Sequence, residues 1–149
     1  ITTGAYVGSK MYTDSESALN TARTTISNLF GNYLGTHRAY FANAVTNGAE
    51  SKGAWFDSSV DLMSEIMVYG SKIRSKANDG THWVTSDKTQ LALFRLNPDM
   101  IVQGRYSYWL RDVIADASFA YVSAYGYANY SGASSSVGVR PAFAVVVPN

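Results

Sequence analysis

Residues 120 to 129 alternate between small side chains and polar or aromatic ones. Ala, Val and Gly take every even position, and the odd positions carry Tyr, Ser, Tyr, Tyr and Asn. A period of two places successive side chains on opposite faces of an extended strand. The pattern therefore predicts a strand or β-ribbon with one small, buried face and one face that carries Tyr, Ser and Asn.

The surrounding segment, residues 112–136, uses only nine residue types: Asp, Val, Ile, Ala, Ser, Phe, Tyr, Gly and Asn. Tyrosine buries a large flat area at low entropic cost and keeps a hydroxyl that can bond, while Ser and Asn adapt their hydrogen bonds to a ligand. Six of the eleven tyrosines lie between residues 106 and 130, which favours a recognition surface. The alternative is a half-buried sheet, since tyrosine favours strands and single exposed aromatic residues are ordinary.

Composition limits the class of protein. A chain of 149 residues, 46% hydrophobic and 15% charged, is long enough for one compact domain, and we expect residues 1–149 to form one. The net charge is +1 and the twelve Lys and Arg residues are scattered, which disfavours nucleic acid and a membrane surface as partners. The absence of Cys excludes disulfides, thiolate metal sites and cysteine catalysis.

The apolar runs and the first residue of the chain each add an expectation. No apolar run is long enough to span a membrane, so no membrane insertion is expected. The chain begins at Ile1 rather than Met, and we expect it to be the C-terminal part of a longer protein.

Two helices are predicted in the first half of the chain. Thr13 and Glu16 have the spacing of a capping box, and apolar residues then recur at helical spacing, which predicts a helix near residues 14–30. Either serine of Ser58–Ser59 could cap a second helix that ends near Gly70.

Strands dominate the second half. They are predicted at residues 106–110, within the Tyr- and Ser-rich stretch and at residues 142–147, after an earlier strand at 37–45. The last of them is almost continuously apolar, which predicts a buried closing strand. Helices first and strands last predict an α+β fold.

Two segments carry a resemblance to a known family: Tyr108–Asp112 (YWLRD) and Gly138–Phe143 (GVRPAF). They resemble the C-terminal part of C-type lectin-like domains of the formylglycine-generating-enzyme type. More narrowly, they resemble the variable proteins of diversity-generating retroelements and related phage tail proteins, a group that residues 43–48 and 67–71 also resemble. The resemblance implies a C-type lectin-like fold with two helices packed on a twisted, mostly antiparallel sheet.

The resemblance also implies which residues bind a ligand. In that family a reverse transcriptase replaces template adenines at random, and the restricted alphabet of residues 112–136 matches the residues that this process allows. The variable positions sit on a solvent-facing surface that invariant strands support. The ligand-binding positions implied here are Asp116, Tyr121, Ser123, Tyr125, Tyr127, Asn129, Tyr130, Ser131, Ser134 and Ser135. Scaffold roles are implied for Trp109, Arg111, Val139, Arg140 and Phe143.

Acidic and histidine residues offer weaker patterns. Asp57, Asp61 and Glu65 fall four apart and would align on one helix face, as an acid/base pair, as a calcium site or as a solvated face, which is the commonest of the three. His37 and His82 have no carboxylate or Cys pattern around them, so a zinc site or a catalytic triad has little support.

Two further patterns have structural explanations. Asn97-Pro98-Asp99 faintly resembles the calcium-dependent sugar motif of true C-type lectins, but the acidic partners of that motif are absent, and we interpret it as a turn. Arg111 and Arg140 could form an anion site, although an Arg beside Trp or Pro is more often a buried structural residue.

These observations and the resemblance predict a non-catalytic domain without cofactor or metal. It would bind a host-surface protein or glycan from the end of a phage tail fibre or from a bacterial surface, with the parent protein forming a homo-oligomer such as a trimer. The alternative is a structural virion or surface-assembly domain whose Tyr-rich face packs against a neighbouring subunit. A third hypothesis is a glycan-processing enzyme that uses the acidic residues, which loss of hydrolysis in Asp61→Ala would support.

Overall fold

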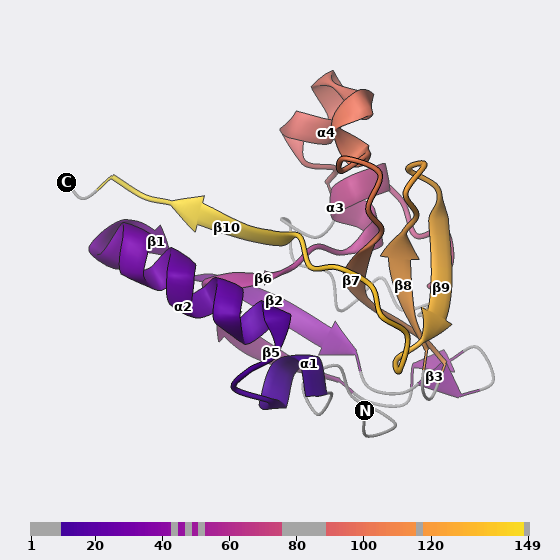
Figure 1. The fold of residues 1–149 in the computed structure, drawn as a ribbon, viewed down its shortest axis with the longest axis horizontal. Helices are drawn as coiled ribbons and strands as arrows, with labels where there is room; N and C mark the ends of the chain where they lie inside the picture. The colour runs from indigo at the N-terminus through magenta and orange to yellow at the C-terminus, as the bar shows by residue number, and fades with distance from the viewer. Residues whose placement is uncertain are drawn as a thin grey trace.

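The computed structural model describes residues 10–42, 45–46, 49–50, 53–75, 89–115 and 118–147. Over these residues the chain is α+β, with one main helix and several small antiparallel sheets (Figure 1). The predicted α+β class is thereby confirmed. The predicted arrangement of one sheet under two helices is not, because the described strands pair in four separate small sheets.

The main helix is α2 (Ala18–Phe30), which confirms most of the helix predicted at 14–30. The hydroxyl of Ser17 caps it by accepting from the backbone N–H of Asn20 at 3.2 Å, and Gly31 ends it with a φ of 51°. The predicted capping box is wrong, because Thr13 ends a separate short helix, α1 (Lys10–Thr13). A tight turn then joins the two helices.

The second predicted helix is wrong in its first half. Residues on either side of Ser59 form strands β5 (Gly53–Ser58) and β6 (Val60–Leu62), and only the end is helical, as α3 (Glu65–Tyr69). The hydroxyl of Ser64 caps α3, and Gly70 ends it in the left-handed conformation that glycine favours. Val60 to Leu62 become a strand because they pair with the C-terminal strand β10 and are buried on both sides.

The strands pair as follows. β10 (Pro141–Val145) lies between β6 and the short β1 (Leu34–Gly35); β2 (His37–Ala42) pairs with β5; β3 (Val45–Thr46) pairs with β4 (Ala49–Glu50); and β8 (Ser118–Val122) lies between β7 (Tyr108–Ala115) and β9 (Ala128–Gly132). The remaining elements are η2 (Gly31–Tyr33), α4 (Ala92–Leu96) and η5 (Pro98–Ile101). In Figure 1, α2 lies over the strands on one side of the molecule, and α3 and α4 lie beside one end of the β7–β8–β9 sheet.

Strand β7 separates two hydrophobic clusters. Trp109 and Val113 point into a first cluster that includes Leu19 of α2. Tyr108 and Leu110, one residue out of phase, point into a second cluster that includes Phe94 of α4. Both faces of this strand are therefore covered, and its burial holds the following hairpin in place.

The C-terminal strand β10 is more exposed than its apolar sequence predicted. Phe143, Val145 and Val147 are 37%, 53% and 85% exposed, so the prediction of a buried closing strand is wrong. Phe143 packs against Phe30 of α2, with ring centroids 5.1 Å apart. A continuous apolar run fits a buried strand, but β10 has a helix over part of one face.

In the part of the chain that the structure describes, no helix is both long and apolar enough to cross a membrane.

Candidate functional site

The predicted binding positions lie mainly on the hairpin formed by β8, β9 and the turn between them. Ser123 closes this turn: its N–H donates to the carbonyl of Tyr127 at 2.8 Å, and its carbonyl accepts from Gly126. The Ser123 hydroxyl also accepts from the backbone N–H groups of Tyr125 and Tyr127, at 3.3 and 3.1 Å. Gly126 has a φ of 85°, which a side chain would strain. The turn is therefore ordered by its own backbone and by Ser123.

The ordered turn displays large tyrosine side chains. Tyr125 and Tyr127 are 81% and 72% exposed, and Tyr130 on β9 is 51% exposed. Ser134 and Ser135 are also exposed, and the hydroxyls of Ser131 and Ser135 bond to each other at 2.7 Å. Five predicted positions are therefore exposed: Tyr125, Tyr127 and Tyr130 on the hairpin, and Ser134 and Ser135 just after it. Ser131 on β9 is half-buried.

Four predicted positions have a different placement. Tyr121 is half-buried and meets the ring of Trp109 edge to face, with centroids 5.9 Å apart, so its predicted projection into solvent is wrong. The Ser123 hydroxyl bonds to backbone N–H groups within the turn. Asn129 pairs with Tyr121 across the sheet, and its side-chain oxygen accepts from the backbone N–H of Tyr130 at 2.9 Å. Asp116 lies outside the described residues.

The single outward face predicted for residues 120–129 is also wrong. Tyr121 points into the first hydrophobic cluster, while Ala120 and Val122 point into the second. Both faces of β8 are covered because the first cluster packs on one face and the second cluster packs on the other. The period of two correctly identifies the strand, but solvent is reached at the turn and at the outer strand β9.

Sequence reasoning missed a group of exposed side chains beside the hairpin. A Cβ at Gly126 would lie 3.2 Å from the side chain of Val102, which places the segment after η5 against the turn. Met100 on η5, and Val102 and Tyr106 in the segment after it, are 40%, 40% and 75% exposed. We define Met100, Val102, Tyr106, Tyr125, Tyr127 and Tyr130 as the tyrosine surface. The only sequence signal for the additional members is that Tyr106 belongs to the same cluster of tyrosines.

Two side-chain hydrogen bonds, one part-buried and one exposed, hold the hairpin from the side of α3. The hydroxyl of Tyr69 donates to the carbonyl of Gly126 at 2.9 Å, and burial raises the pKa of Tyr69, so the hydroxyl keeps its proton. Arg74 donates to the carbonyl of Ala128 at 3.2 Å. The backbone around Arg74 is held in turn by the buried side chain of Glu65.

Glu65 organises this support. Its carboxylate accepts from three consecutive backbone N–H groups, those of Ile73, Arg74 and Ser75, at 3.1, 2.9 and 2.8 Å. Its own N–H donates to the carboxylate of Asp112 on β7 at 2.6 Å. Burial, and then the charge of Glu65, raise the pKa of Asp112 to about 7.

The raised pKa of Asp112 predicts a pH-dependent stability. Between about pH 4 and pH 7 the folded protein keeps a proton that the unfolded chain has released, so this group lowers the free energy of unfolding as pH rises through that window. The slope is at most about 1.4 kcal/mol per pH unit. Asp112→Asn keeps an acceptor for the Glu65 N–H and should remove this slope, so the variant gains stability relative to wild type towards pH 8. Urea unfolding at pH 5 and pH 8 measures the difference, and the exposed Asp57→Asn is the control. Equal pH dependence of wild type and Asp112→Asn would contradict the assignment.

The other acidic and histidine patterns are not brought together as a site. Asp57, Asp61 and Glu65 lie on β5, β6 and α3, so their predicted alignment on one helix face is wrong. Asp61 is held by Arg23, Ser58 and the N–H of Leu62. Over the described ranges no group of three His, Cys, Asp or Glu side chains could hold a metal ion. His82 lies outside those ranges.

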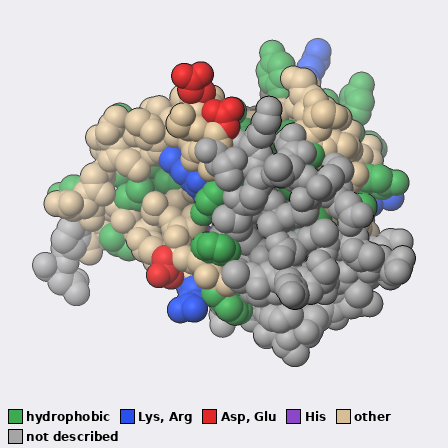
Figure 2. Space-filling model, turned by 90° about the horizontal axis from the view of Figure 1, so that it is seen from below, with side chains coloured by type: hydrophobic (Ala, Val, Ile, Leu, Met, Phe, Trp, Pro, Cys, Tyr) green, Lys and Arg blue, Asp and Glu red, His purple; other side chains and the backbone are tan. Residues whose placement is uncertain are grey.

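Charged side chains are few on the described part of the face drawn in Figure 2. Figure 2 shows acidic and basic side chains in separate small groups over the described part of one face. This agrees with the net charge of +1.

The tripeptide Asn97-Pro98-Asp99 forms a turn, as predicted. Asn97 precedes the 3-10 helix η5, which begins at Pro98.

Comparison with known proteins gives one match. The sequence model of a family described as a domain of unknown function (DUF6273) matches residues 29–147. No curated protein and no solved structure matches the chain.

Proposed function

The chain belongs to the DUF6273 family of domains of unknown function, and we propose that it is a non-catalytic binding module of that family. Its ligand is a protein or glycan on the surface of a host cell, and the tyrosine surface binds it. The observation that carries this proposal is the exposure of Tyr106, Tyr125 and Tyr127, each above 70%, on backbone that internal hydrogen bonds hold in place. Aromatic anchors on an ordered loop lose little entropy on binding and supply much of the energy of interfaces.

A C-type lectin-like arrangement is part of the proposal. The two segments that carry the resemblance lie side by side: the N–H of Trp109 donates to the carbonyl of Gly138 at 2.9 Å, and the N–H of Gly138 donates to the carbonyl of Ser107 at 3.1 Å. Their pairing supports a common scaffold beneath the hairpin. We propose accordingly that the domain sits at a phage tail fibre tip or on a bacterial surface. A reverse-transcriptase gene in the neighbouring DNA, with a near-copy of the codons for 108–140 differing at adenines, would test the diversification part of this proposal.

A test of binding uses the two most exposed tyrosines. Tyr125→Ala combined with Tyr127→Ala should weaken binding of the purified domain to extracted host-surface material by about thirty-fold or more, as loss of two anchors does. The melting temperature should change by no more than about 2 °C, because both side chains lie in solvent. Tyr33→Ala, which removes a 53% exposed tyrosine at η2, is the matched control and should bind like wild type.

The same double variant distinguishes ligand binding from the alternative, a subunit contact in an assembly. Met100 and Val102 add exposed aliphatic surface to the tyrosines, which favours a subunit contact as a second candidate function. If the surface seals an assembly, the double variant breaks the oligomer of the parent protein in sedimentation and leaves surface binding intact. If it is a recognition surface, binding is lost and the oligomer remains.

A further inference from the structure

A cleft of about 380 Å³ lies between β6 and β10 on one side and α3 and α4 on the other. Its volume falls within the range of small-molecule sites, at the low end. Since one water molecule takes about 30 Å³ of liquid volume, the cleft has room for about a dozen non-hydrogen atoms. Most of its lining is apolar, including Leu62, Met63, Met67, Leu91, Phe94 and Pro141.

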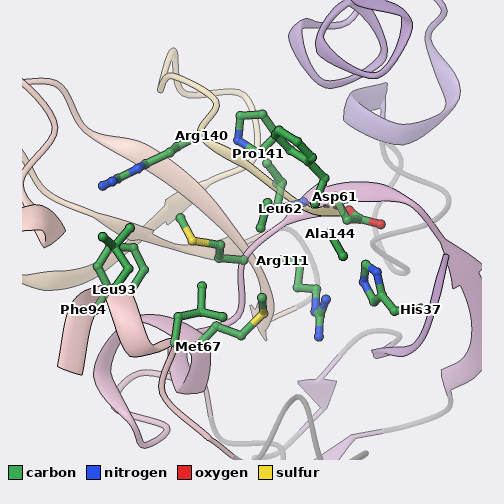
Figure 3. A pocket seen from close by; sticks show the side chains of 14 residues that line it. His37, Asp61, Leu62, Met67, Leu93, Phe94, Arg111, Arg140, Pro141 and Ala144 are labelled. Carbon is green, nitrogen blue, oxygen red and sulfur yellow. Dashed lines mark hydrogen bonds between the residues drawn. The ribbon is translucent and has the colours of Figure 1, made fainter. Parts of the chain in front are cut away.

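Polar side chains stand at two sides of this apolar lining. Figure 3 shows His37, Asp61 and Arg111 on one side of the cleft and Arg140 on the other, near Phe94. Arg111 is 6% exposed, and its backbone N–H is fixed by the carbonyl of Met63 at 2.9 Å. The guanidinium of Arg140 lies over the Phe94 ring at 5.2 Å.

The charge around the cleft is positive. Asp61 is the one acidic residue of the lining, and its carboxylate already accepts from Arg23 at 3.2 Å, from the Ser58 hydroxyl and from the N–H of Leu62. The lining therefore carries two guanidinium groups, those of Arg111 and Arg140, and one carboxylate, which Arg23 already pairs. The buried carboxylate of Glu65 does not line the cleft.

We propose that this cleft binds a small apolar carboxylate. The apolar body lies against Leu62, Met67 and Phe94, and the carboxylate faces the guanidinium of Arg111, which can donate a charge-assisted hydrogen bond to it. Charge-assisted bonds of this kind are stronger in a buried, low-dielectric site than at the surface. This inference is separate from the proposed function, because none of the tyrosine surface lines the cleft.

Three probes of one shape test the chemistry. 4-Phenylbutyrate should bind the purified chain with a Kd of about 1 mM or below, whereas 4-phenylbutanol and 4-phenylbutylamine should bind at least about ten-fold more weakly. Titration followed by amide chemical shifts should move the resonances of Leu62, Phe94 and Ala142 and leave those of Tyr125 and Tyr127 in place. Absence of saturable shifts, or equal binding of the amine, would overturn the proposal.

Three variants test where the ligand lies and which group binds its carboxylate. Ala144→Phe fills the cleft from an exposed position of β10 and should reduce carboxylate binding by ten-fold or more. Val145→Phe, the next residue on the same strand, does not line the cleft and should bind like wild type. Arg111→Gln should abolish the preference for the acid over the alcohol; if this variant does not fold, the pair at 144 and 145 still decides. Unchanged binding by Ala144→Phe would place the ligand elsewhere and refute the inference.

Discussion

Replacing Trp109 by Ala is expected to lower the free energy of unfolding by about 3–5 kcal/mol. The side chain is 5% exposed, and its ring meets Phe119 and Tyr121 edge to face at 6.4 and 5.9 Å. It shares a cluster with Leu19 of α2, so its loss leaves a cavity between the main helix and the β7–β8–β9 sheet. Urea unfolding measures the change.

Phe143→Ala is the matched control for this experiment. The sequence predicted that Phe143 lies in a buried closing strand, but its side chain is 37% exposed and packs on Phe30. We expect its loss to cost about 1 kcal/mol, the scale of a partly buried aromatic contact. Equal costs for the two variants would mean that β10 is covered in the folded protein, and would contradict the exposure described here.

Glu65→Ala is expected to cost about 3 kcal/mol, the second large effect. The carboxylate receives three backbone N–H groups, and bonds to a charged acceptor contribute more than neutral ones. Removing the charge also relieves Asp112, which offsets part of the loss. Amide hydrogen exchange should accelerate at Ile73, Arg74 and Ser75, since these donors lose their acceptor.

Asp57→Ala controls for the loss of a carboxylate as such. Asp57 is exposed on β5, and its removal should change stability by no more than about 0.5 kcal/mol. Unchanged exchange at the three amides in Glu65→Ala would show that the loop holds its shape without the side chain. The support assigned to Glu65 beneath the hairpin would then be wrong.

Local sequence signals predicted elements well where neighbouring residues decide the structure. The helical spacing from Leu19 to Phe30 and the glycine that follows needed no tertiary partner. The period of two at 120–129 correctly predicted extended backbone at the end of β8 and the start of β9, although residues 123–127 between them form the turn. In both cases the signal is geometric and short-ranged.

Other elements depend on contacts with residues far away in the sequence, which a local pattern does not contain. Val60–Leu62 has helix-compatible spacing but pairs with β10, about eighty residues later, and long-range pairing overrides local preference. The same limit applies at the candidate site. Alternation predicts that Tyr121 points away from Ala120, yet it cannot reveal that both faces of β8 are covered. Only the packing of Trp109 against one face and of Phe94 near the other decides this.

The hydrogen bond from the backbone N–H of Tyr130 to the side chain of Asn129 has a consequence for solubility. Among the described strands β9 forms the outer edge of its sheet, and an edge with free N–H groups is a template on which another chain can add a strand. The Asn129 side chain occupies the N–H of Tyr130 and so blunts that edge. A residue without such an oxygen at position 129 would leave folding intact and invite edge-to-edge aggregation, a liability that grows wherever many copies stand close together.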